Sequence, residues 1–286
     1  VTGGTAQARS INQAFAAIAG KYGFAMAVGS QAIAIHDPGL RDTFSVVRDI
    51  NPDGLIIANI GANTEWEKVL EAIEMISADA IQLHFNVPQE LSMPEGDRDF
   101  SGIISNIRQV CANSPVPVIA KEVGFGFSRD SVEKLYDAGI NIFDNGGKGG
   151  TNFVVIEDMR NGLFRGELDE WGIATAASLA EILALKLPVK TIASGGIRTA
   201  LDVAKAICMG ADMVGIAGFF LKILLNHGID ELDKRIEDLL YRLKAVFLMT
   251  GSQNIQAIQK QPMVILGDTA EWLKARGIDT TIWSSR

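Results

Sequence analysis

The sequence predicts an α/β protein built as a single (β/α)8 TIM barrel. Seven short, mostly apolar segments recur along the 286 residues, and each is followed by a segment with helical spacing of apolar residues. Polar and glycine residues gather where the short segments end. Short apolar strands are typical of parallel sheets buried on both faces, and alternating strands and helices in this number favour a barrel. A doubly wound open sheet is the alternative.

The expected elements follow one another regularly. Strands are expected near residues 24–28, 55–60, 80–86, 117–123, 140–144, 189–193 and 213–216. Helices are expected over 6–20, 39–49, 64–76, 100–112, 128–139, 173–187, 199–209 and 230–249, with a last helical segment from 253. Thr64, with Glu67 three residues on, predicts a capping box. Residues 149–172 are expected to form a long active-site loop.

The start of the chain, VTGGT, is typical of the turn between a strand and a helix. The strand itself would lie upstream of this turn or at the very start of the chain. We therefore expect an eighth strand there, and an N-terminal segment of the full protein beyond it. No linker divides residues 1–286, which predicts one barrel domain.

Composition excludes several classes of function. The net charge of −8 disfavours a nucleic-acid partner. Cys111 and Cys208 are far apart, form no metal or redox motif and suit a reducing compartment, so a cytoplasmic protein is expected. We expect no membrane segment, because no apolar run is long enough to span a bilayer.

The stretch AIQLHFN, residues 80–86, alternates apolar and polar side chains, as a half-buried strand does. A proline two residues on ends the strand, and a polar loop containing Gln89 and Glu90 follows. His84 and Asn86 therefore stand at the carboxyl end of a strand, where barrels place their active sites. Glu90 is a candidate ligand for Mg²⁺, which takes one or two carboxylates together with phosphate oxygens and water. A plain capping loop is the alternative.

Glycine-rich turns follow two further strands. SGGIR ends the strand at 189–193 and AG ends the last one, where barrels often bind phosphate through backbone N–H groups and a short extra helix. Gly195 and Gly196 would let the backbone approach an anion, and Gly218 could start the helix. A pair of tight turns is the alternative.

A second glycine-rich loop and a lysine at a strand end also fit anion binding. The loop GGKGGTNF, from residue 146, could cradle a cofactor or a diphosphate, or could be a plain hinge. Lys121 ends an apolar strand, where it needs a partner or an anion. A salt bridge to Glu122 is the alternative, which is weakened because neighbouring side chains of a strand point to opposite faces.

Taken together, VTGGT, AVGSQ, ANIGA, QLHFNVPQE with MPEGDRDF, KEVGFG, DNGGKGGTNF, WGIATAASL, ASGGIR and GIAGFFL resemble the type 2, FMN-dependent isopentenyl diphosphate delta-isomerases. The resemblance covers residues 2–221. It implies interconversion of isopentenyl and dimethylallyl diphosphate in isoprenoid biosynthesis, without net redox change. It also implies FMN, Mg²⁺, NADPH as reductant, and a homo-oligomer, either a tetramer or an octamer.

The same resemblance assigns roles to residues. Contacts to FMN are assigned to Thr2, Gly3, Ser30, Asn59, Lys121, Gly146, Thr151, Gly195, Gly196, Arg198, Ala217 and Gly218. Contacts to substrate are assigned to Ser30, Gln31, His84, Asn86, Gln89 and Glu157. His84, Asn86 and Gln89 are the catalytic candidates, with Gln89 positioning rather than transferring a proton, and Glu90 is assigned to Mg²⁺. Asn145 departs from the small or β-branched residue of the family.

Two other functions are weighed against the isomerase. A different FMN-barrel oxidoreductase, such as a hydroxy-acid oxidase, needs a base that is often His or Cys, placed after the sixth or seventh strand. The histidines of this chain are His36, His84 and His227, and none lies there. A non-catalytic barrel would not need polar residues at every strand end.

Overall fold

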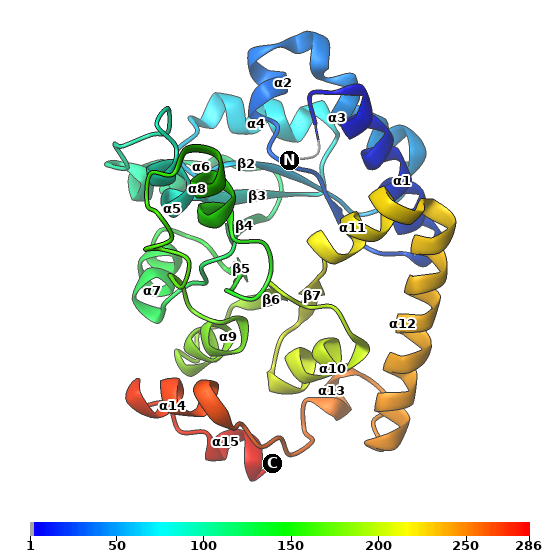
Figure 1. Ribbon diagram of the computed structural model, residues 1–286, viewed down its shortest axis with the longest axis vertical. Coiled ribbons are helices and arrows are strands. Elements are labelled where there is room, and N and C mark those ends of the chain that lie inside the picture. The colour runs from blue at the N-terminus through cyan, green and yellow to red at the C-terminus, as the bar shows by residue number, and fades with distance from the viewer. Residues whose placement is uncertain (1–2) are drawn as a thin grey trace. The chain divides into compact units, whose positions relative to one another are not determined.

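The computed structural model describes residues 3–286, so Thr2, which the sequence assigns to FMN, lies outside the described residues. Its strands are β1 (Met26–Ala27), β2 (Ile56–Gly61), β3 (Ala80–Phe85), β4 (Val118–Glu122), β5 (Ile142–Asp144), β6 (Lys190–Ser194) and β7 (Met213–Gly215). They form one sheet in the order β1 to β7 (Figure 1). The pairs β1–β2, β2–β3 and β6–β7 are parallel. The seven predicted strands are thus confirmed, and their order is that of consecutive βα units.

The helices occupy the segments between the strands and the C-terminal third of the chain (Figure 1). They are α1 (Ala6–Tyr22), α2 (Ala32–His36), α3 (Asp42–Ile50), α4 (Trp66–Met75), α5 (Val87–Ser92), α6 (Ile103–Asn113), α7 (Arg129–Asp137), α8 (Phe153–Asn161), α9 (Thr175–Ala184), α10 (Ala200–Met209), α11 (Gly218–His227), α12 (Ile229–Met249), α13 (Ile255–Ile258), α14 (Gly267–Ala275) and α15 (Thr281–Ser284), with a 3-10 turn η1 (Pro38–Leu40). Within residues 3–286, none of them combines the length and the apolar character that crossing a membrane requires.

The predicted capping box at Thr64 is wrong. The helix begins at Trp66, with Glu65 in the N-cap position and no side-chain cap. Thr64 belongs instead to a turn, since its N–H donates to the carbonyl of Gly61 and its own carbonyl accepts from Asn106 Nδ2. The backbone of Thr64 therefore forms its hydrogen bonds in the turn after β2 and not in the helix.

Two segments expected to be loops contain helices. The proline that ends β3 lies in the first turn of α5, a position that tolerates proline because the first N–H groups of a helix have no intrahelical partner. Within the long loop, Asn152 caps α8 by accepting from the N–H groups of Val154 and Val155. Gly162, at φ 66°, ends that helix. Capping and proline signals were thus present in the sequence, but the segments were too short for periodicity to reveal them.

Strand β3 is buried on both faces at its start, so the half-buried pattern expected from alternation is wrong. Ala80 to Leu83 are all buried, and the Gln82 side chain is 4% exposed. This is the usual environment of a central parallel strand. A buried amide needs a hydrogen-bond partner, and Gln82 has one on the neighbouring strand.

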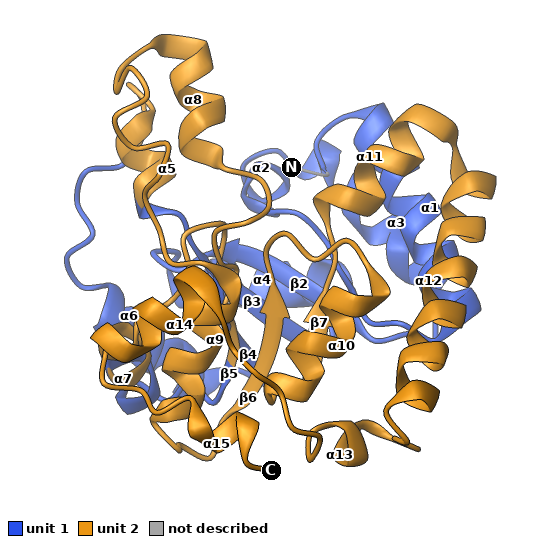
Figure 2. Cartoon of the chain, turned by 60° about the horizontal axis from the view of Figure 1, so that its bottom comes forward, with its two compact units in different colours: residues 1–87, 97–121, 134–142 blue, residues 88–96, 122–133, 143–286 orange. Residues whose placement is uncertain are grey.

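The chain packs as two compact units, coloured separately in Figure 2. Unit 1 comprises residues 1–87, 97–121 and 134–142, and unit 2 comprises residues 88–96, 122–133 and 143–286. In unit 1, the fully buried side chains include Phe44 of α3 and Ile56, Ile60 and Leu83 of the strands. The one-domain expectation stays a prediction.

The core of unit 2 lies around α9, β6 and α10. Leu179, Ala193 and Ile207 belong to it, and Trp283 from the end of the chain is 1% exposed within it. The indole Nε1 of Trp283 donates to the carbonyl of Met209 at 2.7 Å. The last residues therefore cap the C-terminal end of α10, whose N-terminal end carries a capping box immediately after the SGGIR turn.

Candidate functional site

The ends of β2 and β3 bring three polar side chains of unit 1 together. Asn59 Oδ1 lies 2.8 Å from Nδ1 of His84, and Asn59 Nδ2 donates to Oε1 of Gln82 at 3.3 Å. An amide oxygen can only accept, so Nδ1 of His84 carries the proton in this contact. In the neutral ring, Nε2 is then an acceptor. The neighbouring ends of β2 and β3 thus place Asn59 in contact with His84.

His84 is neutral over a wide range of pH. Burial lowers its pKa to about 4, the positive charge of Lys121 adds to the decrease, and the backbone of Ile60 opposes it. A neutral imidazole with a fixed tautomer can accept or donate a hydrogen bond without charging. Among the candidates, His84 is therefore suited to holding a polar group of a ligand in a defined orientation.

The loop after β1 supports the same cluster. Gln31 is fully buried; its Oε1 accepts from the N–H of Asn59, and its Nε2 donates to the carbonyl of Ala72. These bonds favour a structural role for Gln31 over the substrate contact expected from sequence. Ser30 precedes it, half-buried, and Asn86 is half-buried after β3. A Cβ on Gly3 would lie 1.8 Å from the Phe44 ring, so this position has no room for a side chain.

In unit 2, helices α5 and α8 lie side by side (Figure 2) and bring Gln89 to Glu157. Gln89 Nε2 donates to Glu157 Oε1 at 3.3 Å, and Glu157 Oε2 lies 3.2 Å from Nε of Arg160. That oxygen is buried, and its contact with Arg160 has no hydrogen-bond geometry, so it remains an acceptor without a hydrogen-bond donor among the described residues. Arg160 also pairs with Glu95. Arg160 was not foreseen, although it follows Glu157 at helical spacing.

Glu90 lies half-buried on α5. Within residues 3–286, no three His, Cys, Asp or Glu side chains come together as a metal-binding group. A single carboxylate suits Mg²⁺ that takes its other ligands from a diphosphate and water.

The glycine loop after β5 packs directly on the SGGIR turn. A Cβ on Gly195 would lie 2.0 Å from the carbonyl oxygen of Gly147, and a Cβ on Gly196 would lie 2.4 Å from that of Gly149. Both Gly195 and Gly196 have positive φ, at 102° and 80°. From the sequence, these glycines were expected to allow the close approach of an anion. The structure adds a nearer cause, which is contact between the two loops.

The same turns carry unused donors. The N–H groups of Gly195, Gly196 and Ile197 donate to no group of the described chain, and the same holds for the first three N–H groups of α11, at residues 218–220. Ser194 and Gly215 are register partners, so the turns follow adjacent strand ends. Such N–H groups fit a phosphate.

Thr151 and Arg198 border these turns. A Cβ on Gly218 would lie 3.1 Å from Thr151 Oγ1. Nη2 of Arg198 donates to the carbonyl of Gly149 at 3.1 Å, which ties it to the glycine loop. Ala217 is exposed at the start of α11. The expected helix at Gly218 is confirmed.

Asn145 has a structural role that sequence analysis did not identify. It is fully buried, accepts from the N–H of Ser194 at 3.0 Å and donates to the carbonyl of Thr175 at 2.8 Å. Asp144 beside it accepts from the hydroxyl of Ser194. These bonds join β5, β6 and α9 at the base of the glycine loop. A buried amide at a strand end could have signalled such a cross-link.

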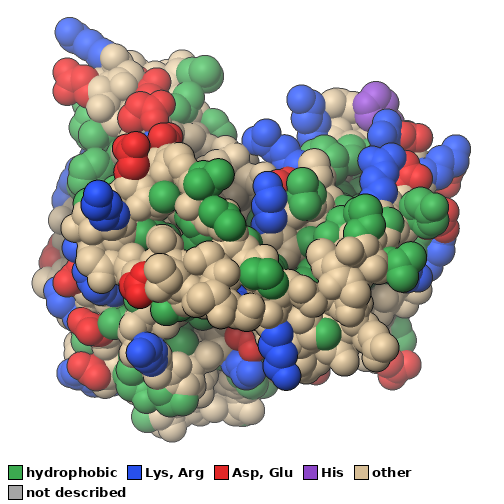
Figure 3. Space-filling view, turned by 90° about the horizontal axis from the view of Figure 1, so that it is seen from below, with side chains coloured by type: hydrophobic (Ala, Val, Ile, Leu, Met, Phe, Trp, Pro, Cys, Tyr) green, Lys and Arg blue, Asp and Glu red, His purple; other side chains and the backbone are tan. Residues whose placement is uncertain are grey.

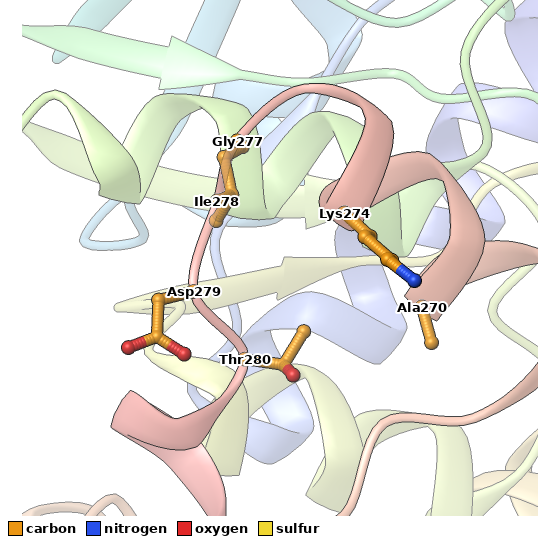
Figure 4. A pocket seen from close by; sticks show the side chains of 6 residues that line it. All are labelled: Ala270, Lys274, Gly277, Ile278, Asp279 and Thr280. Carbon is orange, nitrogen blue, oxygen red and sulfur yellow. The ribbon is translucent and has the colours of Figure 1, made fainter.

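A hollow elsewhere on the described surface is not lined by the candidate residues. It has a volume of about 390 Å³ and is lined by Ala270, Lys274, Gly277, Ile278, Asp279 and Thr280, near the C-terminus (Figure 4). On the face shown in Figure 3, Lys and Arg side chains are interspersed with Asp and Glu.

Comparison with known proteins decides the family. A protein named isopentenyl-diphosphate delta-isomerase from Bacillus licheniformis is 45% identical over 287 residues, covering 100% of this chain and 82% of the relative. One of the same name from Moorella thermoacetica is 48% identical over 276 residues, covering 96% and 80%. The chain belongs to the isopentenyl-diphosphate delta-isomerase family. It is therefore an enzyme of that family, as the sequence motifs predicted.

The flavin-dependent type and the fold have separate support. Residues 97–265 match the family described as FMN-dependent dehydrogenase. A Pediococcus acidilactici lactate oxidase, described as putative, is similar with a TM-score of 0.66 at 17% identity, covering 90% of this chain and 71% of the oxidase. A mandelate oxidase with a monooxide FMN adduct is similar with a TM-score of 0.62 at 16% identity, covering 87% and 72%. These similarities establish the α/β, (β/α)8 class of the fold.

Proposed function

We propose that this enzyme interconverts isopentenyl diphosphate and dimethylallyl diphosphate with bound reduced FMN and Mg²⁺, without net redox change. NADPH is the proposed reductant of the flavin. The observation that carries the proposal is the 40–48% identity, over nearly the whole chain, to relatives that bear the isomerase name. The donors and carboxylates described above supply the chemistry that such a reaction needs.

The proposed flavin phosphate partners are the unused N–H groups of the SGGIR turn and of the first turn of α11. Gly146 and Thr151 of the glycine loop, with Ser30, Asn59 and Lys121 at other strand ends, are the proposed partners of the ring and ribityl chain. Lys121 favours negative charge on a nearby group by its own positive charge.

Glu90 is the proposed ligand of a Mg²⁺ ion that bridges the substrate diphosphate. His84, Asn86 and Gln89 are proposed to hold the substrate, with Gln89 kept in position by Glu157. An amide has no useful pKa for proton transfer, and His84 stays neutral, so both orient rather than ionise.

Moving a double bond in an unactivated alkene requires that one carbon gain a proton and another lose one. Reduced FMN supplies an electron-rich ring that can exchange protons and stabilise positive charge beside it. The chain's own part is to bind the diphosphate, keep the alkene in place and exclude water. Residues 149–172, including α8, are proposed to cover the pocket.

Oxidation of a hydroxy acid is the competing function, since the structural neighbours include oxidases. No histidine occurs between residues 85 and 226, so the loops after β5 and β6 hold no imidazole to abstract a proton. This distribution favours the isomerase.

The enzyme is further proposed to be a cytoplasmic homo-oligomer, a tetramer or an octamer. Its two cysteines are free thiols, which suits a reducing compartment. The end of α12 exposes Leu248 and Met249, at 82% and 77%, as apolar surface that a neighbouring subunit could cover. Light scattering after size-exclusion chromatography measures the assembly.

The deciding experiment is an anaerobic isomerisation assay followed by NMR, with FMN, Mg²⁺ and isopentenyl diphosphate, with and without NADPH. Product that forms only with reduced flavin, without stoichiometric loss of reductant, supports the proposal. Bound FMN without product overturns it. Oxidation of lactate or mandelate by the same preparation would favour the oxidase instead.

A further inference from the structure

We infer that Glu122 is a positioning residue, whose carboxylate shapes residues 123–126 and thereby sets the glycine loop, residues 146–151, in the form that receives FMN. This inference rests on the proposed FMN site. The sequence motifs assign Glu122 no role in the site, and the one interaction considered for it was a salt bridge to Lys121.

One carboxylate oxygen organises the loop after β4. Oε2 of Glu122 accepts from four consecutive N–H groups, those of Val123 at 2.8 Å, Gly124 at 3.1 Å, Phe125 at 2.7 Å and Gly126 at 3.2 Å. The two glycines have φ of 139° and 72°, which turns successive N–H groups inward. The carboxylate is therefore the centre on which this loop is folded.

The loop so folded contacts the glycine loop at both ends. The N–H of Gly126 donates to the carbonyl of Gly146 at 3.3 Å, and a Cβ on Gly146 would lie 1.8 Å from the carbonyl oxygen of Glu122. A Cβ on Gly124 would lie 2.7 Å from the carbonyl oxygen of Thr151. Gly146 and Thr151 are two of the proposed FMN contacts.

A third contact reaches the middle of the glycine loop through Ile173. The carbonyl of Phe125 accepts from the N–H of Ile173 at 2.7 Å, and the carbonyl of Ile173 accepts from the N–H of Lys148 at 2.8 Å. The path from Glu122 to the beginning, middle and end of the glycine loop thus consists of main-chain contacts. If the loop after β4 opens, all three supports are lost together.

The loop after β4 requires an acceptor oxygen from residue 122 at a fixed distance from its N–H groups. A negative charge alone would not be sufficient. Burial raises the pKa of Glu122 to about 7, and the four N–H donors oppose that rise. The amide oxygen of glutamine can accept from the same donors, whereas alanine offers no acceptor. Glu122→Gln should therefore retain the loop conformation and the FMN affinity that Glu122→Ala loses.

The test compares FMN dissociation constants, by flavin fluorescence, for the wild type, Glu122→Ala and Glu122→Gln. We expect Glu122→Ala to weaken FMN binding about thirtyfold and Glu122→Gln less than about fivefold, given the typical energies of such hydrogen bonds. The matched control is Asp279→Ala. The Asp279 carboxylate also accepts from a backbone N–H group, that of Thr281 at 2.9 Å, but it lies near the C-terminus, outside the glycine loop and the proposed pocket.

Hydrogen exchange of the flavin-free chain gives a readout that does not need FMN. We expect faster exchange at residues 123–126 and 146–151 in Glu122→Ala, and unchanged exchange there in Asp279→Ala. Failure of the wild type to bind FMN would defeat the proposed function, while the exchange result would still decide whether Glu122 shapes both loops. Unchanged exchange and unchanged FMN affinity in Glu122→Ala would overturn the inference.

Should Glu122→Ala fail to fold, Glu122→Asp carries the test. Its carboxylate is one methylene shorter and cannot reach all four N–H groups, so we expect about tenfold weaker FMN binding, the effect of one or two lost hydrogen bonds. An FMN affinity equal to that of the wild type in this folded variant would contradict the inference.

Discussion

The ring Nδ1 of His84 donates a hydrogen bond to Oδ1 of Asn59 across neighbouring parallel strands, over 2.8 Å. Asn59 is itself held by Gln82, so the tautomer and the orientation of the imidazole are determined by buried amides. The lowered pKa of His84 follows from the same burial. A neutral imidazole held in this way recognises a ligand through the direction of its hydrogen bond rather than through electrostatic charge.

His84 should remain neutral until the solution is distinctly acid. Its folded-state pKa, about 4, lies below the unfolded value of 6.5, so the stabilisation it reflects is present above pH 6.5 and is lost as the pH falls towards 4. We expect the unfolding free energy of the wild type to fall more steeply between pH 6.5 and 5 than that of His84→Gln. Chemical denaturation across this range measures it. Equal slopes would refute the assignment.

Gly195→Ala should disrupt the paired glycine turns. The added Cβ would meet the carbonyl oxygen of Gly147 at 2.0 Å, in addition to the backbone cost of a positive φ. Gly251→Ala is the control, because Gly251 has φ of 65° and open space around it. We expect about 1 kcal/mol of destabilisation for the control, the usual backbone cost, and clearly more for Gly195→Ala. Only the latter should weaken FMN binding; similar losses in both would disprove the steric explanation.

Arg276→Met should destabilise unit 2. Arg276 donates from Nε to Oε1 of Glu181 at 2.7 Å, and the Glu181 side chain is fully buried. Removal of the guanidinium leaves the buried carboxylate of Glu181 without this opposite charge. In comparable pairs, such a loss lowers the unfolding free energy by about 3 kcal/mol. Urea unfolding measures the loss.

Arg242→Met is the control for that measurement. Arg242 pairs with Asp238 on the exposed surface of α12, where a lost ion pair costs about 0.5 kcal/mol or less. If the two variants lose equal stability, the Arg276 pair is no stronger than a surface pair.

Glu90→Gln should raise the Mg²⁺ concentration needed for half-maximal isomerisation by about tenfold or more, since a neutral amide is a much poorer ligand for this hard cation. Glu67→Gln, an exposed change on α4, is the control and should leave the requirement unchanged. Magnesium titrations at saturating FMN give both values. A Glu90→Gln enzyme with the wild-type magnesium dependence would remove Glu90 from the metal site.

The sequence predicted those features that depend on strand ends and on local signals. Polar residues were expected to gather where the strands end, and Asn59 and His84 do so at the ends of β2 and β3. The helix expected over 199–209 is α10, which begins at Ala200. The carboxylate nest at Glu122 could not be predicted, because it depends on backbone angles at two glycines and not on any pattern of side chains. Helix α5 was not predicted, because Pro88 was interpreted only as the residue that ends the strand, although it also lies in the first turn of this helix.

The glycine turns at residues 146–150 and 195–196 fit each other backbone to backbone. A side chain introduced at Gly150, Gly195 or Gly196 meets main-chain atoms of the facing turn, which cannot be made smaller by a second substitution. A second mutation therefore cannot compensate for a side chain at these positions, even if the rest of the enzyme changes. Adaptation to another ligand would have to come from the residues around these turns, while the turns themselves stay as they are.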